Sequence, residues 1–398
     1  RRRWDEMIPA PVVAGKNTRI AMAKTNNKVV LSVTNDLYTD PRVDKVCNFL
    51  TRNGFDVTLV GRRYGDSATL APRAYKTHRL RLLFRKGGLF YAEYNIRLFF
   101  YLLFHHFDLF VANDLDTLLP NVLISKLKRK RLVYDSHEYF CGELSIADRP
   151  FVKHVWKSIE RFCFPKLKDV ITVSQSIVDQ YEQEYGIRPH LVRNIPPKAT
   201  PPVTETRVSL QLPEDKTIII LQGNGINEGR GGEELVEAMP FVDEKAVFLI
   251  VGSGTVIPQL KERVKDLQLE HRVRFVSRVT PEMLYNYTYL SDIGIALDRD
   301  LSMNLRFSLP NKLFEYIKAG TPVVVSNLIE RARIVGQYRV GLIVEGFQAE
   351  NIAEKINKLV NDKQLYNDLK ANCKIAAEDL CWENEEKVLE EIYLRDKG

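Results

Sequence analysis

The sequence is poor in cysteine. Among 398 residues there are five, an odd number, and no two form a C-x-x-C pair. They are Cys47, Cys141, Cys163, Cys373 and Cys381. This usage argues against a disulfide framework or a cysteine zinc site, and it predicts buried free thiols in a reducing compartment. We therefore expect a cytoplasmic protein.

The sequence also lacks a long apolar run. None reaches the roughly 18 residues that a membrane-spanning helix needs. The most apolar stretch, residues 89–104, is interrupted by Glu93, Asn95 and Arg97. Residues 1–27 are basic but lack the apolar core and cleavage site of a secretory signal, so they are predicted to be a tail. An integral membrane protein is not expected.

Composition and charge define the protein class. The chain is 45% hydrophobic and 27% charged, which excludes a wholly disordered chain. Residues 1–200 contain 33 Lys and Arg against 20 Asp and Glu, whereas residues 201–398 contain 25 against 31. The basic first half predicts an anionic partner on that half.

Apolar runs alternate with amphipathic stretches along the chain. The alternation predicts parallel sheets with helical crossovers. It breaks at 194–216, a segment with five prolines, and restarts at 217. We therefore predict an α/β fold with two Rossmann-like domains facing each other across a cleft. The predicted parts are a first domain at 28–200, a linker at 201–216, a second domain at 217–380 and a C-terminal helix at 381–398 that packs back toward the first domain.

Residues 307–327, FSLPNKLFEYIKAGTPVVVSN, carry the most informative pattern. Ser308 is expected to cap a helix with Pro310 in its first turn and Gly320 at its end. The start of such a helix offers free N–H groups and a positive dipole end to a phosphate. Glu315 could accept hydrogen bonds from two vicinal hydroxyls, such as those of a ribose. The alternative is an ordinary capped helix with a surface glutamate.

This segment resembles the nucleotide-sugar-binding segment of glycosyltransferase family four, whose members are retaining enzymes of the GT-B fold. Residues 221–239 resemble the first strand, loop and helix of that family's second domain. Further segments resemble the first domain of a bacterial branch: 111–120, 133–140, 171–177 and 192–197. The resemblance covers residues 28–395 in family order.

The resemblance implies a set of donor-binding residues. Glu315 would bind the donor ribose, and Arg230 would grip the diphosphate. The remaining implied donor-binding residues are Gly223, Asn311, Lys312 and Leu313 at the sugar and diphosphate, and Arg278 and Val279 at the base. The sequence departs from the family pattern at Phe307, where the first glutamate of the E-x7-E signature is expected, and at Asn224, where a second basic residue is expected.

The first domain supplies the other implied site residues. His137 follows a predicted strand, and the resemblance implies that it touches the donor sugar; either Asp135 or Glu138 could orient it. The acceptor-side candidates lie in two loops that follow strands: Asp36, Arg42, Asp114 and Asp116. Asp40 is explained as a helix cap that precedes Pro41.

Residues 78–106 combine basic and apolar character. Arg79, Arg81, Arg85 and Lys86 precede the aromatic helix predicted at 89–104. One interpretation of segment 79–104 is peripheral docking on the inner membrane surface, and the other is a core helix behind a basic loop. No recognition motif for nucleic acid accompanies the segment, so no nucleic-acid partner is expected.

The resemblance implies a metal-independent retaining glycosyltransferase of cell-surface polysaccharide biosynthesis. It would transfer a sugar from a nucleoside-diphosphate sugar, UDP- or GDP-linked, to a glycan or lipid-linked acceptor, without a cofactor. No D-x-D motif is present; the nearest pattern is the DRD of residues 298–300. Two alternatives remain: a nucleotide-sugar epimerase of the same fold, and an inactive nucleotide-sugar-binding scaffold.

Overall fold

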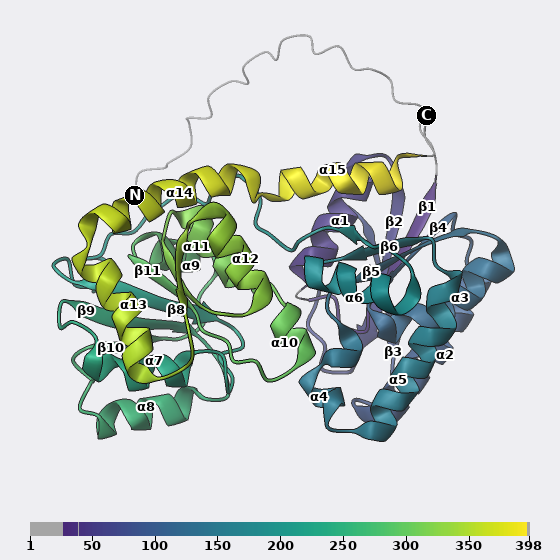
Figure 1. The fold of residues 1–398 in the computed structure, drawn as a ribbon. Helices are drawn as coiled ribbons and strands as arrows, with labels where there is room; N and C mark the ends of the chain where they lie inside the picture. The colour runs from purple at the N-terminus through teal and green to yellow at the C-terminus, as the bar shows by residue number, and fades with distance from the viewer. Residues whose placement is uncertain (1–26, 39, 396–398) are drawn as a thin grey trace, which may run out of the picture.

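The computed structural model describes residues 27–38 and 40–395, so the predicted tail lies almost wholly outside the described residues. Within that part of the chain the strands form two sheets, one of seven strands and one of six, and every strand pair is parallel. The two sheets lie side by side, each with helices packed around it (Figure 1). This is the GT-B arrangement of two Rossmann-like units.

The first sheet has the order β3-β2-β1-β4-β5-β6-β7. Its strands are β1 (Lys28–Ser32), β2 (Asp56–Arg63), β3 (Lys76–Arg81), β4 (Leu109–Asn113), β5 (Arg131–Ser136), β6 (Asp169–Thr172) and β7 (His190–Leu191). The helices are α1 (Pro41–Arg52), α2 (Gly87–Phe104), α3 (Leu115–Lys128), α4 (Leu144–Ala147), α5 (Pro150–Cys163) and α6 (Gln175–Tyr185), with short 3-10 turns η1 (Phe140–Gly142) and η2 (Phe164–Lys166). The apolar strands β1 and β4 are buried on both faces, as parallel strands between helical layers must be.

The second sheet has the order β10-β9-β8-β11-β12-β13. Its strands are β8 (Thr217–Gly223), β9 (Ala246–Gly252), β10 (Val273–Val276), β11 (Ile293–Ala296), β12 (Val323–Ser326) and β13 (Gly341–Val344). The helices are α7 (Gly232–Ala238), α8 (Ile257–Asp266), α9 (Pro281–Tyr289), α10 (Met303–Phe307), α11 (Asn311–Ala319), α12 (Ile329–Tyr338), α13 (Ala349–Asn361), α14 (Lys363–Asp379) and α15 (Trp382–Tyr393), with the 3-10 turn η3 (Met239–Phe241).

The chain crosses between the two units twice. It crosses first through residues 192–216, which contain no helix or strand, and it returns from α14 to α15 along one side of the molecule (Figure 1). Trp382, Leu389 and Tyr393 of α15 are buried in the same apolar cluster as β1 and α1 of the first unit. The two crossings touch, because the Trp382 N–H donates to the carbonyl of Pro196 at 2.9 Å. The C-terminal helix is thus part of the first unit's core.

The structure confirms the predicted free thiols and the cap at Asp40, but it contradicts the predicted cap at Ser308. All five cysteines are buried free thiols, as predicted. Asp40 caps α1 and accepts a hydrogen bond from the Val43 N–H at 3.2 Å, with Pro41 as the first helical residue. Ser308 does not cap α11; its hydroxyl donates to Leu305 O, and the cap position is Pro310. The α10 helix, which sequence periodicity did not reveal, ends at Phe307 and so places Ser308 at its end instead.

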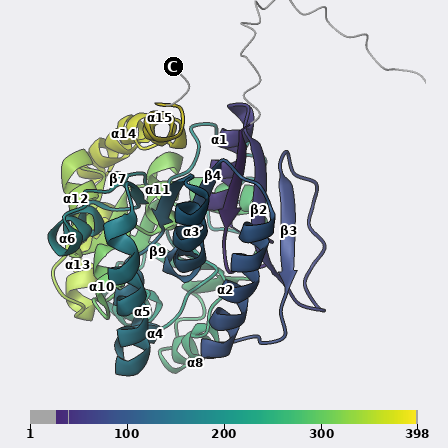
Figure 2. The same ribbon diagram turned by 90° about the vertical axis from the view of Figure 1, so that its right-hand side faces the viewer.

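The apolar segment forms α2, which lies along the outside of the first sheet beside α3 and β3 (Figure 2). No helix in the described residues is long and apolar enough to cross a membrane. Tyr94, Leu98 and Leu102 are buried in the core, whereas Ile96, Phe100 and other apolar residues of α2 face outward. One face of the helix is therefore core and the other is an exposed apolar stripe, and docking on a membrane stays a prediction.

Candidate functional site

Each sheet has one point at which the strand order reverses direction. In the first sheet this point lies between β1 and β4, and in the second it lies between β8 and β11. The crevice beyond the carboxyl ends of strands at such a point is where open parallel sheets bind ligands. Asp114 follows β4 directly, and Gly223 ends β8. Residues that the sequence singled out therefore occupy the position that topology favours.

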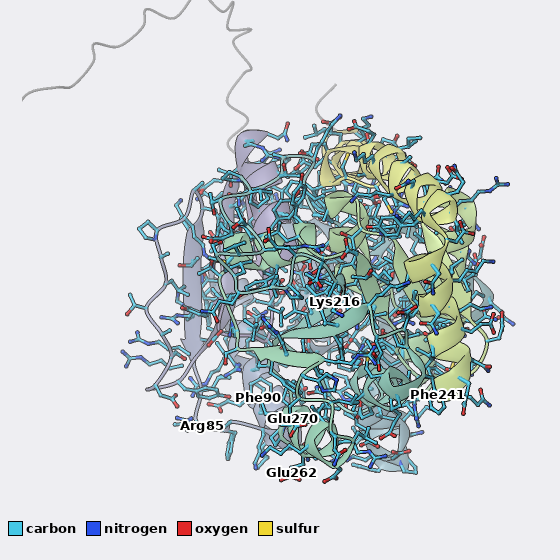
Figure 3. The ribbon with its side chains drawn as sticks, turned by 90° about the vertical axis from the view of Figure 1, so that its left-hand side faces the viewer. Arg85, Phe90, Lys216, Phe241, Glu262 and Glu270 are labelled. Carbon is cyan, nitrogen blue, oxygen red and sulfur yellow. The ribbon has the colours of Figure 1, made fainter. Side chains whose placement is uncertain are left out.

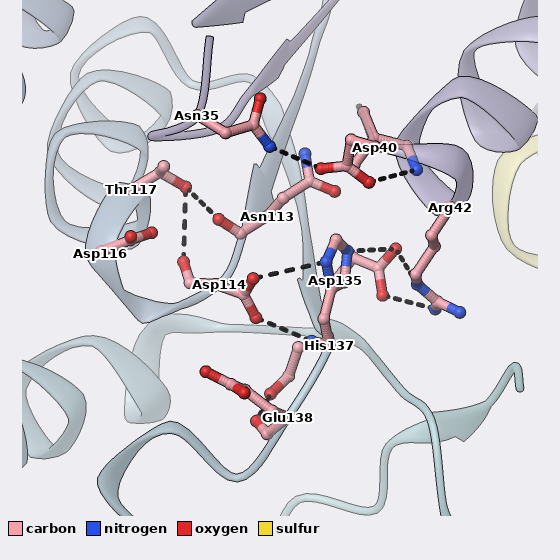
Figure 4. A network of polar contacts seen from close by, with 12 residues as sticks. Asn35, Asp40, Arg42, Asn113, Asp114, Asp116, Thr117, Asp135, His137 and Glu138 are labelled. Carbon is pink, nitrogen blue, oxygen red and sulfur yellow. Dashed lines mark hydrogen bonds and ion pairs between the residues drawn. The ribbon is translucent and has the colours of Figure 1, made fainter. Parts of the chain in front are cut away.

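In the first domain, His137 lies between two carboxylates (Figure 4). Its Nδ1 atom is 3.4 Å from Oδ2 of Asp114, and its Nε2 atom is 3.5 Å from Oδ2 of Asp135. The backbone N–H of His137 also donates a hydrogen bond to Oδ1 of Asp114 at 2.8 Å. Sequence reasoning offered Asp135 or Glu138 as the orienting residue; the structure assigns that contact to Asp135 and adds Asp114.

The charges of this cluster shift its pKa values. Burial lowers the pKa of His137, but the facing carboxylates of Asp114 and Asp135 outweigh that effect and raise the pKa to about 9. Burial and the neighbouring Asp114 raise the pKa of Asp116 to about 7. Although burial opposes it, Arg42 together with His137 holds the pKa of Asp135 well below its usual range. Burial also raises the pKa of Asp114, and His137 partly opposes that rise. At neutral pH the cluster therefore contains an imidazolium that faces the carboxylate of Asp135 on one side and Asp114 on the other.

Arg42 supports this cluster from α1. Its guanidinium donates to both carboxylate oxygens of Asp135, at 2.7 and 3.3 Å, and to Val192 O at 2.8 Å. Only 3% of its surface is exposed, so its position is that of a buried support for Asp135. The expectation that Arg42 contacts the acceptor does not fit this burial.

The other acceptor-side candidates differ in burial and in hydrogen-bond partners. Asp116 accepts a hydrogen bond from the Thr34 hydroxyl at 2.6 Å and is buried. Asp36 is half-buried and accepts from the Tyr38 N–H at 3.1 Å. Asp114 has a backbone φ of 59° and ψ of 165°, a conformation that non-glycine residues rarely adopt. Its interactions with His137 hold the side chain in the cluster.

In the second domain, three cations surround one buried carboxylate. Arg230 approaches Asp298 at 3.1 Å, Arg331 at 3.2 Å and Lys312 at 3.9 Å. Burial would raise the pKa of Asp298, but Lys312, Arg331 and Arg230 lower it, so the carboxylate is ionised. Since one negative charge faces three positive ones, the cluster retains an excess of positive charge for an anion.

A cavity of about 190 Å³ opens beside this cluster. Its walls are the glycine loop after β8, the start of α11 and the cation cluster, and they include Gly223, Arg230, Asn311 and Lys312. Gly231 has a φ of 92°, and a Cβ there would lie 2.9 Å from Leu297 Cβ. A glycine is required at this position for the loop to pass so close to the end of β11, which brings Arg230 to Asp298.

The start of α11 points the expected backbone groups at this cavity. The first N–H groups of any helix lack helical partners, and in α11 no side chain caps them. The N–H of Leu313, however, donates to Pro310 O at 3.0 Å. Asn311 and Lys312 therefore fit the expected phosphate-facing role better than Leu313 does.

Glu315 is anchored at the end of β8. Its Oε2 atom accepts a hydrogen bond from Nε2 of the Gln222 side chain at 2.5 Å. Oε1 of the same side chain accepts from the Thr288 hydroxyl at 2.6 Å. Burial raises the pKa of Glu315, and Gln222, Lys318 and Lys45 partly oppose the rise. Lys45 belongs to α1 of the first domain, the helix that also carries Arg42. The Lys45 ammonium itself donates to Asn194 Oδ1 at 2.9 Å and to Ile195 O at 2.8 Å.

The two domains also meet through α10. Phe307 packs edge-on against Tyr139, with ring centroids 6.1 Å apart. The Tyr139 N–H donates to Oδ1 of Asn304 at 3.1 Å, and the Asn304 amide donates to Glu138 at 3.1 Å and to Glu143. At the position where the family has a carboxylate, this chain therefore has an aromatic contact with the opposite domain.

Sequence reasoning missed part of this site. Asp298 appeared only as part of a motif that was set aside, although its position directly after a buried strand was an available signal. Arg331 lies within α12, where nothing in the local pattern distinguishes it. Arg278 is exposed and Val279 packs against the apolar core of the second domain, and neither residue lines the cavity. Their expected role at the base stays a prediction.

Comparison with known proteins identifies the family. The model of "Glycosyl transferases group 1" matches residues 202–375, and the model of "Glycosyltransferase Family 4" matches residues 42–197. The chain belongs to the GT-B glycosyltransferases of the family-four type. The two matches fall on the two sheets in the order that the resemblance implies.

Curated relatives of this glycosyltransferase are distant. A GDP-mannose-dependent alpha-(1-6)-phosphatidylinositol monomannoside mannosyltransferase of Mycobacterium tuberculosis is 25% identical over 164 residues, 40% of this chain and 42% of the relative. An uncharacterised glycosyltransferase of Methanocaldococcus jannaschii is 26% identical over 193 residues, 47% of each chain. The aligned segments span less than half the length of these relatives.

Solved structures share the fold of this glycosyltransferase over nearly its whole length. Sucrose-phosphate synthase from Thermosynechococcus elongatus has a TM-score of 0.76 at 18% identity, covering 93% of this chain and 99% of that one. The Anabaena protein HepE, solved in complex with UDP and glucose, has a TM-score of 0.70 at 15% identity, covering 94% of this chain and 100% of that one. At these identities the likeness establishes the fold.

Proposed function

We propose that this glycosyltransferase transfers a sugar, with retention at the anomeric carbon, from a nucleoside-diphosphate sugar to a glycan or lipid-linked acceptor of cell-surface polysaccharide type. One observation carries the proposal: three cations share the single carboxylate of Asp298 beside a cavity that an uncapped helix start also faces. An excess of positive charge next to free N–H groups suits a diphosphate.

The donor would bind with its diphosphate in this cavity. The side chains of Arg230 and Lys312 and the backbone N–H groups of Asn311 and Lys312 would contact the phosphate oxygens. Gly223 would allow the donor to approach the backbone closely. Glu315 would accept hydrogen bonds from the ribose. Arg278 and Val279 would lie at the base. Because the cations themselves offset the diphosphate charge, we propose a site that needs no metal ion and no cofactor.

His137 would act at the reacting carbon. As an imidazolium between Asp114 and Asp135, it would place a positive charge beside the donor sugar. The acceptor hydroxyl would attack from the same face as the leaving phosphate, which takes up the hydroxyl proton as the new glycosidic bond forms. Asp36 and Asp116 would position the acceptor.

Two donor classes are proposed on the strength of the relatives. The mycobacterial relative is named as GDP-mannose-dependent, and the Anabaena structure contains UDP. We propose a UDP- or GDP-linked sugar as the donor. We further propose a cytoplasmic location, with peripheral docking of segment 79–104 on the inner membrane face.

The alternative is an epimerase acting on the nucleotide sugar alone. A protein described as a putative UDP-N-acetylglucosamine 2-epimerase from Listeria monocytogenes shares the fold, with a TM-score of 0.57 at 14% identity. An epimerase would convert donor without an acceptor, so product analysis in the absence of acceptor separates the two. An inactive scaffold would bind nucleotide and convert nothing.

Melting temperature against a nucleotide panel tests the donor site. We expect UDP or GDP to raise it, since saturation at a hundredfold excess over Kd adds about 2.7 kcal/mol to the stability, and we expect EDTA to leave the shift unchanged. Arg230→Ala should weaken nucleotide binding about 10- to 100-fold, because one charge-assisted contact is lost. Arg263→Ala, which removes an exposed arginine of α8, is the matched control. A panel without any shift would contradict the proposal.

A further inference from the structure

A cavity of the first domain lies outside the donor site. It has a volume of about 700 Å³ and is enclosed by α2, α3, α4 and α5. Its walls are mostly apolar: Tyr91, Leu115, Leu119, Phe140, Ile146, Val152, Val155, Trp156 and Ile159 line it. The volume is that of a small-molecule site, and the apolar walls suit a hydrocarbon chain.

One end of this cavity adjoins the histidine cluster. Glu138 and Glu143 line it, and Glu138 follows His137 directly in the chain. Asn95 also lines it, and its amide donates to the backbone carbonyl of Asp116 at 2.8 Å. A ligand that filled the cavity would therefore end beside the proposed acceptor residues.

The rim of the cavity is basic and apolar. Arg149 lines it and forms no ion pair with another described residue. Phe151 is 79% exposed at the same rim, two residues after Arg149 in the chain. Gly87 and Gly88, at the start of α2, leave open space on the other side. An anionic group at this rim would find a cation and an apolar neighbour together.

We infer that this cavity binds the apolar chain of the acceptor, an acyl or prenyl chain joined through a phosphate that Arg149 contacts. The inference rests on the proposed function. Of the two acceptor classes proposed there, a glycan or a lipid-linked glycan, it selects the lipid-linked one. The chain would pack between α2 and α5 against Trp156, and the hydroxyl to be glycosylated would lie toward Glu138 and Asp116. Each buried methylene adds to the affinity, so a chain of medium length would bind more tightly than a short one.

A brominated lipid probe tests the cavity without knowledge of the natural acceptor. We would titrate the full chain with 10-bromodecyl phosphate below its micelle concentration and follow tryptophan fluorescence, because bromine quenches indole on contact. Trp156 lines the cavity, whereas Trp382 lies on α15. Quenching is expected in the wild type and should disappear in Trp156→Phe, while decyl phosphate still binds that variant in equilibrium dialysis.

Two pairs of variants separate the cavity from the rest of the surface. Gly88→Leu extends a side chain into the open space, and Val155→Glu puts a charge on the wall; each should weaken decyl phosphate binding at least tenfold. The matched controls are Gly336→Leu, at an exposed helical glycine of α12, and Val208→Glu, at an exposed valine of the segment that joins the two domains. Neither control should change the binding.

The outcomes distinguish this inference from the proposed function. Absence of binding, equal binding by all four variants, or full displacement by inorganic phosphate would overturn it. So would attachment to anionic vesicles without quenching of Trp156, since that result means surface docking alone. If nucleotides raise the melting temperature and the probe does not bind, the lipid acceptor fails and the transferase stands. If the probe binds and no nucleotide does, the cavity is a lipid site without an acceptor role.

Discussion

At the scale of single residues, His137 shows how the charges of a buried cluster depend on one another. Removing the imidazolium would leave Asp114 and Asp135 facing each other with Arg42 as their nearby cation. Breaking a buried ion pair on one side is costly because the remaining charge stays buried without its partner. The same histidine is our candidate for the reacting carbon, so its protonation links stability and activity.

The pKa of His137 predicts a pH dependence of stability. Because the folded pKa, about 9, exceeds the usual value of 6.5, the protonated histidine stabilises the folded state fully below pH 6.5. That contribution is lost as the pH rises through about 9. We expect the difference in unfolding free energy between wild type and His137→Gln, measured by urea denaturation, to shrink by up to about 3 kcal/mol between pH 6.5 and 9.5.

His271→Gln is the matched control, because His271 is exposed in the second domain. Its unfolding free energy should follow that of the wild type throughout this range. A constant difference between wild type and His137→Gln would contradict the assigned pKa.

At the scale of elements, α2 is unusual because it is apolar on two faces. One face packs in the core, and the other exposes a stripe that includes Leu89, Ile96, Phe100 and Phe104. Arg85, on the basic segment that precedes the helix, projects at the edge of the molecule where the first domain is seen beyond the second (Figure 3). A stripe of this kind on a protein surface marks an interaction site more often than a random exposure does.

We expect α2 to bind anionic membranes through this stripe. Phe100→Asp should lower co-sedimentation with phosphatidylglycerol vesicles roughly tenfold, because it replaces an inserted aromatic ring with a repelled charge. Ile375→Asp, which changes a 70% exposed residue on α14, should leave co-sedimentation unchanged. If both variants lost the same share of vesicle binding, or if neither lost any, the α2 stripe would not be the membrane-binding surface.

At the scale of the whole molecule, the two domains share a contact that contains a proton. Burial, Asp114 and Glu143 raise the pKa of Glu138 to about 9, so this carboxyl is neutral at physiological pH. Asn304 of the second domain donates to both Glu138 and Glu143. A second contact joins Glu330 of α12 to Ser176 of α6, through the serine N–H at 2.8 Å and its hydroxyl at 2.5 Å.

This arrangement predicts that alkaline pH weakens the domain contact. Burial raises the pKa of Glu138 to about 9, with Asp114 and Glu143 adding to the rise and Asn304 of the second domain partly opposing it. The buried carboxyl therefore binds a proton that an exposed Glu138 would release, and the buried state loses stability as the pH rises through about 9. We expect the radius of gyration, measured by small-angle X-ray scattering, to increase between pH 7 and 10. Glu143→Gln, which removes the facing charge, should suppress the increase. An unchanged radius in the wild type would contradict a proton-dependent contact.

The alternation of strands and helices, and hence the two parallel sheets, could be predicted from local sequence, because burial between helical layers demands continuous apolar strands separated by amphipathic helices. The free thiols and the cap at Asp40 could be predicted too, since they depend on local chemistry. The meeting of Arg230, Lys312 and Arg331 at Asp298, and the position of His137 between Asp114 and Asp135, became visible in the folded structure alone. These contacts join residues far apart in the chain, and their spacing follows from strand order, which no local pattern encodes. The same holds for Arg42, whose sequence position at a loop gave no sign that its guanidinium would be buried against β5.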